Sequence, residues 1–569
     1  NKMIILGLNH GEINSSAAIV KNGELLFGSP EERYTRQKKT KAFPINSIKF
    51  CLEKLNIEIN NVDFIAQAWN PAASLNNFNP VLSNSRIKRE DYFYTIADNL
   101  FKLKEDRLTD DWTLMQFGNS LPSIYFIQHH RAHAANSFYL SPFKNAAILI
   151  ADWRGEFETT TMYEGDGTQL KLLDDLKLPH SLGMLYATFT ELLGYKPDSD
   201  EWKVMALSAF DINYEKEYQF IRSTINLLEN GFFEMDQAYY KGAILDQPNL
   251  YTDKLVDKLG GRVGIPGEKV SDWHKKIACA MQKVSEDVSL NMLHALYEKT
   301  KSKNLVLGGG FFMNSVFNGK IKKLTKFENI YVPYAPTDAG NSIGAALYVA
   351  HHLKKEKRNS KFNSSYLGES FTDKQVEEVL KRRSIKFTKV KNREKKIADL
   401  LASGKIVAVC KGRMEFGERA LGNRSILADP RKASTKDEIN RIIKYRENFR
   451  PFAPVTLQNL VTKYFDVHED FTSNYMEKVV KFKKEFIKSL QAVAHVDGSG
   501  RVQTVNEKIN KDFTKIIEEF EKITGLPFVL NTSFNINGEP IVLSPDDALN
   551  TFFNSGLKFL FINNYMIMK

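Results

Sequence analysis

The stretch LGLNHGEINSSAAIVKNGEL, Leu6–Leu25, contains two apolar strand-like runs separated by a turn of Gly, Asn and Ser. Two later runs have a similar ending: AAILIADW from Ala146 and NLVLGGGF from Asn304 both lead into loops that carry Gly or Asp. Helical patterns follow several of these loops. Strands that alternate with helices in this way predict an α/β protein.

Two glycine-rich loops extend this pattern. GGGFFMNSVFNGK, Gly308–Lys320, follows the strand-like NLVL, and DAGNSIGAAL, Asp338–Leu347, follows the strand-like NIYVPY. Backbone amides in such loops can bind phosphate, although Gly308, Gly309 and Gly310 are also explained by close packing of a strand against a helix. Together with Leu6–Leu25, the loops predict an actin-like (ASKHA) duplicated nucleotide-binding fold, which is an inference about fold alone.

The chain loses its apolar periodicity between His351 and Ser365, where charged residues, Asn and Ser accumulate. We therefore predict a domain boundary there, with a large domain at 1–360 and a smaller α/β domain at 361–569. The smaller domain begins with the helical pattern TDKQVEEVLKRR, continues with the buried strand KIVAVC and an arginine-rich loop, and ends with the strands LPFVLNTSFN and GLKFLFINN.

Composition narrows the classes of protein. The 569 residues are 43% hydrophobic and 26% charged, which is typical of a globular chain of several domains. The three cysteines are far apart, so we expect neither a disulfide framework nor a cysteine metal site. No leader and no apolar run long enough to cross a membrane is evident, which favours a cytoplasmic location. The net charge of +11 comes from dispersed lysines without a nucleic-acid-binding motif, so anionic small substrates are the expected partners and oligomeric state stays open.

Two histidines in QHHRAHAANSFYL indicate a metal site. His129 and His133 are four residues apart, so a helix would place both imidazoles on one face. Asp152 and Asp338 each lie where a strand gives way to a glycine-containing loop, which is the usual active-site edge of an α/β sheet. Two His and two Asp with water suit Fe²⁺ or Mn²⁺ better than structural zinc. His130 is a base or merely a neighbour, and we favour the neighbour.

An anion site is predicted between Lys411 and Arg450. Eleven basic residues fall there, and seven of them are among the 21 arginines of the chain. Arginine suits bidentate capture of phosphate or carboxylate, and we expect Arg413, Arg419 and Arg424 to act in this way because Gly412, Gly417 and Gly422 bring backbone amides close. From Thr435 to Arg446, acidic residues interleave with basic ones, so a solvated helix face explains that part equally well.

Motifs along nearly the whole chain resemble those of the O-carbamoyltransferases of the antibiotic-tailoring and nodulation-factor type. In the first domain they are EERYTRQKK at Glu31, the HxxxH from His129, SLGMLYATFTELLGY at Ser181, DEWKVMAL at Asp200, GGGFFMN at Gly308 and PTDAGNSIGAAL at Pro336. In the second they are GERALGNRSILADPR at Gly417, IKYRENFRPFAP at Ile443, HVDGSGRVQTV at His495 and TGLPFVLNTSFNINGEPIV at Thr524.

The resemblance implies an ATP-dependent enzyme with two active sites. A YrdC-like C-terminal domain would convert carbamoyl phosphate and ATP, the latter with Mg²⁺, into carbamoyl-adenylate and pyrophosphate. The actin-like N-terminal domain would then transfer the carbamoyl group to a hydroxyl of a small molecule, such as a sugar or another natural product. Enclosure would keep water from the activated intermediate.

The resemblance also implies roles for individual residues. The metal ligands would be His129, His133, Asp152 and Asp338, with Fe²⁺ the first choice and Mn²⁺ or Zn²⁺ the alternatives. His129, Asp338, Arg419 and Arg424 would be catalytic. Substrates and nucleotide would be bound by Gly308, Gly309, Gly310, Asn314, Lys444, Arg446, Arg450, Arg501, Asn531 and Ser533. Asn531 and Ser533 are expected to hydrogen-bond phosphate or carbamoyl oxygens, unless they only cap a turn, and His495 and Asp497 to order the arginine loop.

Three positions depart from the family pattern: Trp153 with Arg154 after the strand of Asp152, Glu418 before Arg419, and Ala206 after DEWKVM. Two other classes of protein stay open. An actin-fold small-molecule kinase would form ADP without carbamoyl phosphate. A non-catalytic module that binds nucleic acid or a partner protein would need aromatic residues interleaved with its basic patch, and the aromatic residues near the arginines are spaced for packing.

Overall fold

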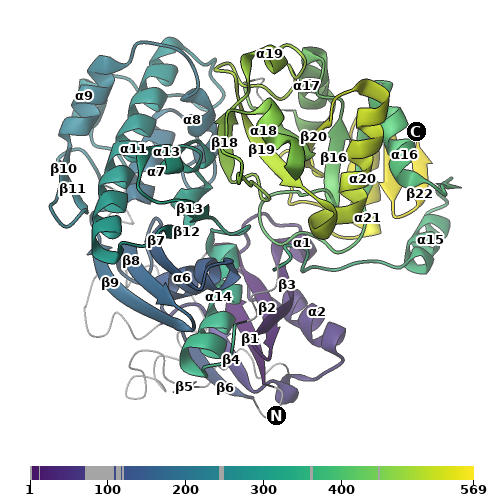
Figure 1. Ribbon diagram of the computed structural model, residues 1–569, viewed down its shortest axis with the longest axis horizontal. Coiled ribbons are helices and arrows are strands. Elements are labelled where there is room, and N and C mark those ends of the chain that lie inside the picture. The colour runs from purple at the N-terminus through teal and green to yellow at the C-terminus, as the bar shows by residue number, and fades with distance from the viewer. Residues whose placement is uncertain are drawn as a thin grey trace. The chain divides into compact units, whose positions relative to one another are not determined.

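The computed structural model describes residues 3–11, 13–70, 108–109, 117, 121–241, 249–358, 363–445 and 449–569. The chain divides into two compact units that are not contiguous in sequence. Unit 1 comprises 1–31, 41–314 and 320–363, and unit 2 comprises 32–40, 315–319 and 364–569. Figure 1 labels most helices and strands of both units. Two short segments from the first half of the chain thus belong to the C-terminal unit.

Unit 1 contains a first sheet in the order β3-β2-β1-β4-β6-β5. Its strands are β1 (Ile4–Asn9), β2 (Ser16–Lys21), β3 (Glu24–Pro30), β4 (Phe64–Gln67), β5 (Leu108–Thr109) and β6 (Ser123–Phe126). Strands β1, β2 and β3 pair antiparallel, whereas β4 is parallel to β1 and β6 is parallel to β4. The two strands and turn predicted from Leu6–Leu25 are confirmed as β1 and β2.

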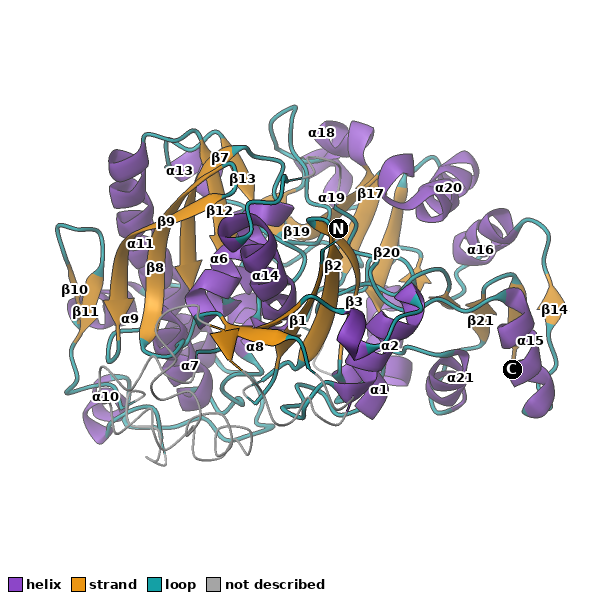
Figure 2. Ribbon diagram, turned by 90° about the horizontal axis from the view of Figure 1, so that it is seen from below, coloured by secondary structure: helices purple, strands orange, loops and turns teal. Residues whose placement is uncertain are grey.

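A second sheet of unit 1 repeats this arrangement in the order β13-β12-β7-β8-β9. Its strands are β7 (Asn145–Ala151), β8 (Glu158–Asp166), β9 (Gln169–Lys177), β12 (Asn304–Gly308) and β13 (Asn329–Tyr331). Again three successive strands pair antiparallel, and β12 and β13 add parallel to β7. The repeated strand order is the duplication expected of an actin-like fold. In Figure 2 the strands of these sheets are drawn orange between purple helices.

Two helices join the halves of unit 1. Helix α6 (His129–Leu140) follows β6 of the first sheet, and α14 (Asn341–Leu347) follows β13 of the second. A Cβ on Gly344 of α14 would lie 1.8 Å from the carbonyl oxygen of Ala132 in α6, and one on Gly7 of β1 would lie 1.8 Å from that of Ser342 in α14. Glycine is therefore required where α14 meets α6 and β1.

Further helices and a small hairpin complete unit 1. They are α2 (Ile45–Leu55), α7 (Leu182–Leu192), α8 (Glu201–Leu207), α9 (Glu215–Ser223), β10 (Ile225–Leu227), β11 (Phe233–Met235), α10 (Asp253–Lys258), α11 (Asp272–Thr300) and α13 (Ile321–Leu324). Ala206, where the family pattern is not followed, is a buried residue near the end of α8.

Unit 2 is built on a mixed sheet in the order β14-β22-β21-β15-β16-β20-β17-β19-β18. The strands are β14 (Thr388–Lys389), β15 (Val407–Cys410), β16 (Arg424–Ala428), β17 (Ala453–Leu457), β18 (Lys478–Lys481), β19 (Ser499–Val505), β20 (Phe528–Ser533), β21 (Phe559–Ile562) and β22 (Tyr565–Met568). The helices are α1 (Glu32–Thr35), α12 (Ser315–Asn318), α15 (Asp373–Arg382), α16 (Arg393–Ala402), α17 (Ala433–Ile439), α18 (Val461–Tyr464), α19 (Lys484–Ile487), α20 (Glu507–Thr524) and α21 (Pro545–Phe553). The predicted helix and strands of the smaller domain are confirmed as α15, β15, β20 and β21.

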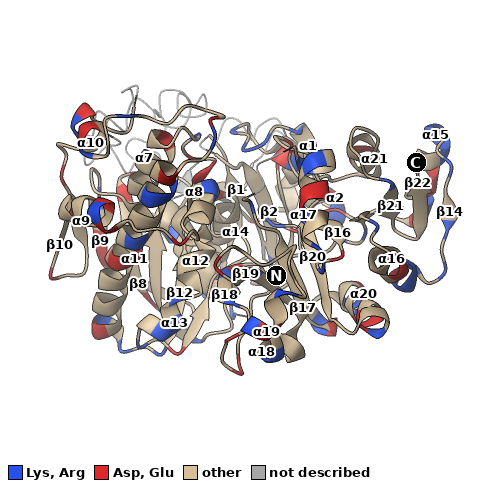
Figure 3. Ribbon diagram, turned by 90° about the horizontal axis from the view of Figure 1, so that it is seen from above, with Lys and Arg blue, Asp and Glu red and all other residues tan. Residues whose placement is uncertain are grey.

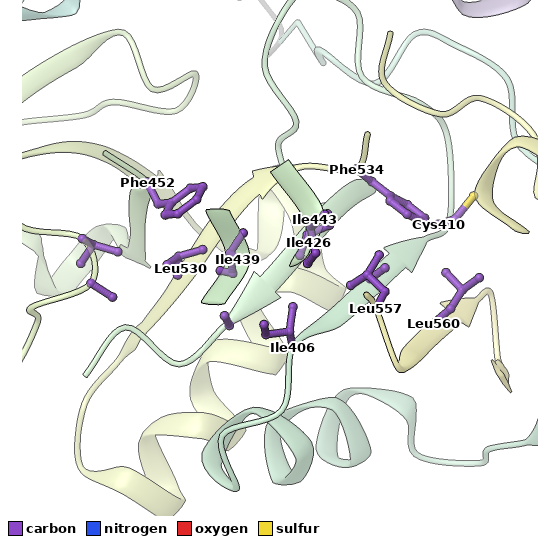
Figure 4. Packing of buried hydrophobic residues seen from close by; sticks show 14 of the residues in the cluster. Ile406, Cys410, Ile426, Ile439, Ile443, Phe452, Leu530, Phe534, Leu557 and Leu560 are labelled. Atoms are coloured by element: carbon purple, nitrogen blue, oxygen red, sulfur yellow. The ribbon is translucent and has the colours of Figure 1, made fainter. Parts of the chain in front are cut away.

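Apolar residues cover both faces of this sheet. Ile426 and Leu530 belong to a buried cluster with Ile439, Ile443 and Leu557 on one face (Figure 4). Val529 and Leu427 belong to a second cluster with residues of α16 and α20. Because side chains alternate along a strand, β15, β16, β19, β20, β21 and β22 each contribute residues to both clusters.

Charged residues are interspersed along the ribbon of both units, with Lys and Arg seldom separated for long from Asp and Glu (Figure 3). This distribution agrees with the predicted dispersal of the basic excess. Among the described residues, no helix is both long enough and apolar enough to cross a membrane.

Candidate functional site

Helix α6 presents the two predicted metal-binding histidines at its N-terminal end. His129 is its first residue, and His133 lies one turn later. The carboxylate of Glu156 accepts hydrogen bonds from the backbone N–H of His129, at 3.1 and 3.0 Å, and from that of Asn70, at 2.7 Å. Glu156 therefore satisfies amides that the start of a helix leaves without partners, and it fixes the direction in which α6 begins.

The four predicted metal ligands come together in unit 1. The Nε2 atoms of His129 and His133 are 3.1 Å apart, and each is 3.0 Å from Oδ2 of Asp152 and 3.3 Å from Oδ1 of Asp338. All four ligand atoms lie within 4.8 Å of one another. Both histidines are buried, and Asp338, at the start of the short turn that leads into α14, is 9% exposed.

Backbone amides hold Asp152 in this orientation. Its second oxygen, Oδ1, accepts from the N–H of Trp153 at 2.9 Å and from the N–H of Gly310 at 3.3 Å. Gly309 has φ +89°, and a Cβ there would lie 2.1 Å from the carbonyl oxygen of Ala151. The glycine run thus permits close packing of β12 beside β7 and contributes an amide to Asp152. Hydrogen bonds of this kind orient metal-binding carboxylates.

Burial and the opposite charges of neighbouring groups act against each other on the titration of these side chains. Burial lowers the pKa of His129, but the carboxylates of Asp338 and Asp152 outweigh burial and raise it well above the ordinary value. Hydrogen bonds from both histidines hold the pKa of Asp152 well below its ordinary value despite burial. The pKa of His130 is lowered well below its ordinary value by burial and by the two neighbouring histidines.

The donor set suits a divalent cation. Two imidazole nitrogens and two carboxylate oxygens that face a common point are typical of Fe²⁺, Mn²⁺ or Zn²⁺ sites. The Nε2 atoms of His129 and His133 both lie next to Oδ2 of Asp152. Without a cation, each Nε2 would need a proton to form a hydrogen bond with this carboxylate. His130 turns elsewhere: its Nδ1 lies 2.9 Å from the hydroxyl of Thr161. The structure therefore places His130 beside the cluster and outside it.

The remaining predicted residues of unit 1 have internal partners. A Cβ on Gly308 would lie 2.2 Å from Oγ of Ser137 in α6, so close packing accounts for this glycine. The amide of Asn314 exchanges hydrogen bonds with that of Gln282 at 3.0 and 3.1 Å, and Glu286 accepts from Gln282 at 3.0 Å. Lys320 donates to Glu286 at 2.8 Å. This network on α11 was not predicted.

A row of polar side chains lies on one face of the sheet of unit 2. Arg501 and Gln503 of β19 are on the same face as Val505, and Asn531 and Ser533 of β20 are on the same face as Val529, because these positions are two residues apart. Val505 and Val529 belong to the cluster packed against α16 and α20. The predicted residues Arg501, Asn531 and Ser533 therefore continue the face that these helices cover.

Lys444 joins this row. It lies in the one-turn π-helix Asn440–Lys444 and is buried. Its Nζ donates to the backbone carbonyl and hydroxyl of Ser533, at 2.6 and 3.3 Å, and to the backbone carbonyl and Oδ1 of Asn535, at 3.0 and 2.8 Å. The lysine thus fixes the NTSFN turn and brings a positive charge to the end of β20. Arg450 is also buried in this unit, whereas Arg446 lies outside the described residues.

The arginine loop is held by a carboxylate that we did not predict. Oε1 of the buried Glu415 accepts from the backbone N–H groups of Leu421, Asn423 and Arg424 at 2.8, 2.7 and 3.1 Å. The intervening N–H, that of Gly422, donates to the hydroxyl of Ser425 at 2.9 Å. These four amides, including that of Gly422, therefore have internal partners and are not free to bind an anion.

The predicted arginines of the loop differ in their surroundings. All three nitrogens of the Arg424 guanidinium donate to backbone carbonyls, namely those of Leu543, Lys411, Gly412, Asn423 and Glu369. Arg413 similarly donates to the carbonyl of Leu367 at 2.8 Å. These contacts hold both side chains to the backbone of unit 2, and their predicted contacts with phosphate stay predictions.

Arg419 donates no hydrogen bond to any part of the chain that the structure describes. Burial lowers its pKa, an effect that the neighbouring Glu418 opposes. Burial also lowers the pKa of Arg33, an effect that Glu32, Glu415 and Glu418 oppose. The Nη2 atom of Arg33 donates to the carbonyl of Gly417 at 2.6 Å. A half-buried guanidinium without protein partners, on a loop held by Arg33 and Glu415, is available to bind an anion.

His495 and Asp497 order the turn before β19. Oδ1 of Asp497 accepts from the N–H and hydroxyl of Ser499 at 3.0 and 2.6 Å, and Lys481 donates to Asp497 at 2.7 Å. Burial lowers the pKa of His495 to about 4, with the nearby cations Arg501, Lys436 and Lys481 acting in the same direction and Asp497 against them. The described contacts thus connect this pair to the strand that carries Arg501 and not to the arginine loop.

Two family models match this chain. "Carbamoyltransferase N-terminus" covers residues 4–347, and "Carbamoyltransferase C-terminus" covers residues 398–569. The chain belongs to the carbamoyltransferase family. It is accordingly an enzyme, and the family resemblance predicted from its motifs is confirmed.

Relatives of this carbamoyltransferase act in different settings. The nodulation protein NolNO of Sinorhizobium fredii is 32% identical over 98% of this chain and 79% of its own length. The 3'-hydroxymethylcephem-O-carbamoyltransferase of Amycolatopsis lactamdurans is 26% identical over 74% of this chain and 76% of its own length. Among solved structures, HypF of T. kodakarensis aligns with 64% of this chain and 49% of its own chain. The two are 13% identical in sequence, and the TM-score of 0.33 indicates low structural similarity.

Proposed function

We propose that this carbamoyltransferase is ATP-dependent and performs two half-reactions, each in one unit. Unit 2 would form carbamoyl-adenylate from carbamoyl phosphate and ATP. Unit 1 would transfer the carbamoyl group to a hydroxyl of a small molecule of natural-product or sugar-like type. The observation that carries the proposal is the presence of two chemically different polar sites, one of histidines and carboxylates in unit 1 and one of cations and amides in unit 2.

The first half-reaction balances with one water. Water breaks the bond between phosphorus and the bridging oxygen of carbamoyl phosphate, which gives carbamate and inorganic phosphate. An oxygen of carbamate then attacks the α-phosphorus of ATP, and pyrophosphate leaves with its bonding electrons. Both steps concentrate negative charge, so fixed cations would lower their barriers.

Unit 2 offers such cations on one sheet face and its adjoining loop. Arg419 donates no hydrogen bond to the described residues, Lys444 is held at the end of β20, and Arg501 lies on β19 on the face that carries Asn531 and Ser533. Arg450 and Arg446 are retained as candidate phosphate ligands from the family pattern. Arg424 enters the proposal only as a residue that holds the loop, because its nitrogens bind carbonyls.

Unit 1 would carry out the transfer. A divalent ion held by His129, His133, Asp152 and Asp338, with Fe²⁺ the first choice, would act as a Lewis acid towards the carbamoyl carbonyl or the adenylate phosphate. Trp153 and Gly310 would keep Asp152 in place through their N–H groups. Gly308–Gly310 and Asn314 would lie along the nucleotide, as the family pattern implies. The acceptor hydroxyl would lose its proton as its oxygen bonds to the carbamoyl carbon and AMP leaves.

Exchange of labelled pyrophosphate into ATP tests the first half-reaction. Purified protein should incorporate label only when carbamoyl phosphate is present, because carbamate is needed to return carbamoyl-adenylate to ATP. Arg419→Ala should lose exchange, whereas Lys484→Ala, at an exposed residue of α19, should keep it. Formation of ADP without carbamoyl phosphate would instead support a kinase, and the adenylation proposal would be rejected.

A further inference from the structure

One buried oxygen on the polar face of unit 2 receives no hydrogen bond from the described residues. Asn531 is 1% exposed and lies in β20, between β16 and β17, opposite Leu427 and Ala453. Its Oδ1 has no hydrogen-bond partner within the part of the chain that the structure describes. Buried polar atoms in native proteins are nearly always hydrogen-bonded, so such an atom requires an explanation.

The orientation of this amide is fixed by its neighbours. Nδ2 of Asn531 donates to the backbone carbonyl of Ala420 at 3.0 Å and to Oε1 of Gln503 at 2.9 Å. A backbone carbonyl only accepts, so Nδ2 and not Oδ1 must face Ala420. Both amide hydrogens are thereby used. What Asn531 can still offer a ligand is an acceptor.

The surroundings define what kind of ligand this acceptor would meet. Ala420, to which Asn531 donates, directly follows Arg419, whose guanidinium has no hydrogen-bond partner among the residues that the structure describes. Two residues further along β20, Ser533 receives a hydrogen bond from the ammonium group of Lys444. The ligand would therefore present an N–H donor to Asn531 and an anionic group to the nearby cations.

We propose that Oδ1 of Asn531 accepts a hydrogen bond from the NH₂ group of carbamoyl phosphate and so selects it over acyl phosphates that carry a methyl group there. This inference rests on the proposed function of unit 2. It also reverses the direction expected from the sequence, where Asn531 donated to phosphate or carbamoyl oxygens. A methyl group is not a hydrogen-bond donor. It would leave Oδ1 buried without a donor, which disfavours binding.

Two stable phosphonates test this selection by calorimetry on the full chain. Phosphonoacetamide keeps the NH₂ group, and acetonylphosphonate replaces it with methyl at nearly the same size and charge. The wild type should bind phosphonoacetamide about tenfold more tightly, the ratio for one hydrogen bond to a buried acceptor. Asn531→Ala should bring that ratio close to one, and Asn550→Ala, at an exposed asparagine of α21, should leave it unchanged.

The ratio separates recognition from a structural effect. If Asn531→Ala weakens both phosphonates equally and keeps the wild-type ratio, Asn531 acts only by holding Ala420, and the proposal is overturned. Equal affinity of the wild type for both phosphonates overturns it too, even if the variant does not fold. Failure of the wild type to bind either phosphonate, together with absent pyrophosphate exchange, would overturn the proposed function of unit 2 as well. If pyrophosphate exchange persists but the wild type binds both phosphonates equally, only the selection by Asn531 is overturned.

Discussion

Two arginines five positions apart illustrate how little residue type alone decides. Arg424 is buried with its three nitrogens bonded to backbone carbonyls, whereas Arg419 has no protein partner among the described residues. Replacing Arg424 by Ala should lower the free energy of unfolding by about 3 kcal/mol, because several buried carbonyls lose their donor. Arg419→Ala should leave it nearly unchanged and abolish pyrophosphate exchange. Urea unfolding followed by circular dichroism measures the first effect.

The outcome that contradicts this assignment is the reverse pattern. If Arg424→Ala unfolds at the wild-type urea concentration and only loses activity, its carbonyl contacts contribute no stability. That result would instead support the predicted role of Arg424 as a substrate ligand.

The histidines of α6 allow a matched pair of variants. His133→Ala removes one of two imidazole ligands and should reduce bound metal at least tenfold, because Asp152 and Asp338 then hold the ion with a single nitrogen. His130→Ala should retain metal, since its Nδ1 contacts Thr161. Metal content per chain after gel filtration, measured by mass spectrometry of the element, distinguishes the two. Equal loss of metal in both variants would contradict the assignment of His133, and not His130, as a metal ligand.

Spacing in the sequence was sufficient to predict His129, His133, Asp152 and Asp338 as one cluster, because helical periodicity and strand ends determine where such residues lie. The same reasoning could not find Glu415, Glu156 or Gln503. Their partners are backbone amides or another side-chain amide, and such contacts depend on loop conformation and leave no spacing signal. Nor could it separate Arg419 from Arg424, since both stand in the same glycine-rich loop.

At the scale of elements, the contact between α6 and α14 depends on glycine. A Cβ on Gly344 would lie 1.8 Å from the carbonyl oxygen of Ala132. Gly344→Ala should therefore lower the free energy of unfolding by about 3 kcal/mol, as overpacking of a close helix contact does. Metal content should fall with it, because α6 carries two ligands and Asp338 lies directly before α14. Thermal unfolding and metal analysis of the same sample provide both values.

A second glycine serves as the control for this prediction. Gly404 has φ +80° but nothing within 4 Å of an added Cβ. Gly404→Ala should cost only about 1 kcal/mol of backbone strain and leave metal content unchanged. Similar losses for both variants would show that steric contact is not what distinguishes Gly344.

Most elements were predictable because their apolar runs are long and end at glycine or polar loops; β1, β7, β12, β15, β20 and α15 are examples. The crossing of α6 and α14 was not, because only packing of distant segments reveals which glycines lie at a contact. The pairing of β16 with β20 likewise joins segments about a hundred residues apart and places Asn531 beside Ala420.

At the scale of the whole molecule, unit 2 includes two segments that the sequence did not assign to it, 32–40 and 315–319. Arg33 donates to the carbonyl of Gly417, and Arg36 donates to those of Pro540 and Ile541 at 2.9 and 2.8 Å. A fragment of residues 364–569 should therefore melt at a lower temperature than unit 2 does in the full chain. Differential scanning calorimetry of fragment and full chain tests this, and an unchanged transition would show that the two segments contribute nothing.

Acid sensitivity also belongs to the whole chain, because buried histidines occur in both units. Burial lowers the pKa of His351 to about 4 in unit 1, and that of His495 to about 4 in unit 2. Between pH 4 and 6.5 the unfolded state binds protons that the folded state does not, so stability is fully present above pH 6.5 and is lost as pH falls towards 4. His351, 1% exposed, should account for up to about 3 kcal/mol. Urea unfolding of wild type and His351→Gln across this range should give a shallower slope for the variant, and parallel slopes would contradict the assignment.

The bond between Arg33 and Gly417 spans 384 residues of chain. A ribosome that adds about 5 to 20 residues per second delivers the arginine roughly 20 to 80 s before its partner carbonyl exists. The segment 32–40 must therefore remain undocked while unit 1 is synthesised around it, and it settles only after the last third of the chain has emerged. For the same reason, the C-terminal unit is poorly suited to transfer between genes as a single exchangeable cassette, because part of it is encoded several hundred codons upstream of the rest.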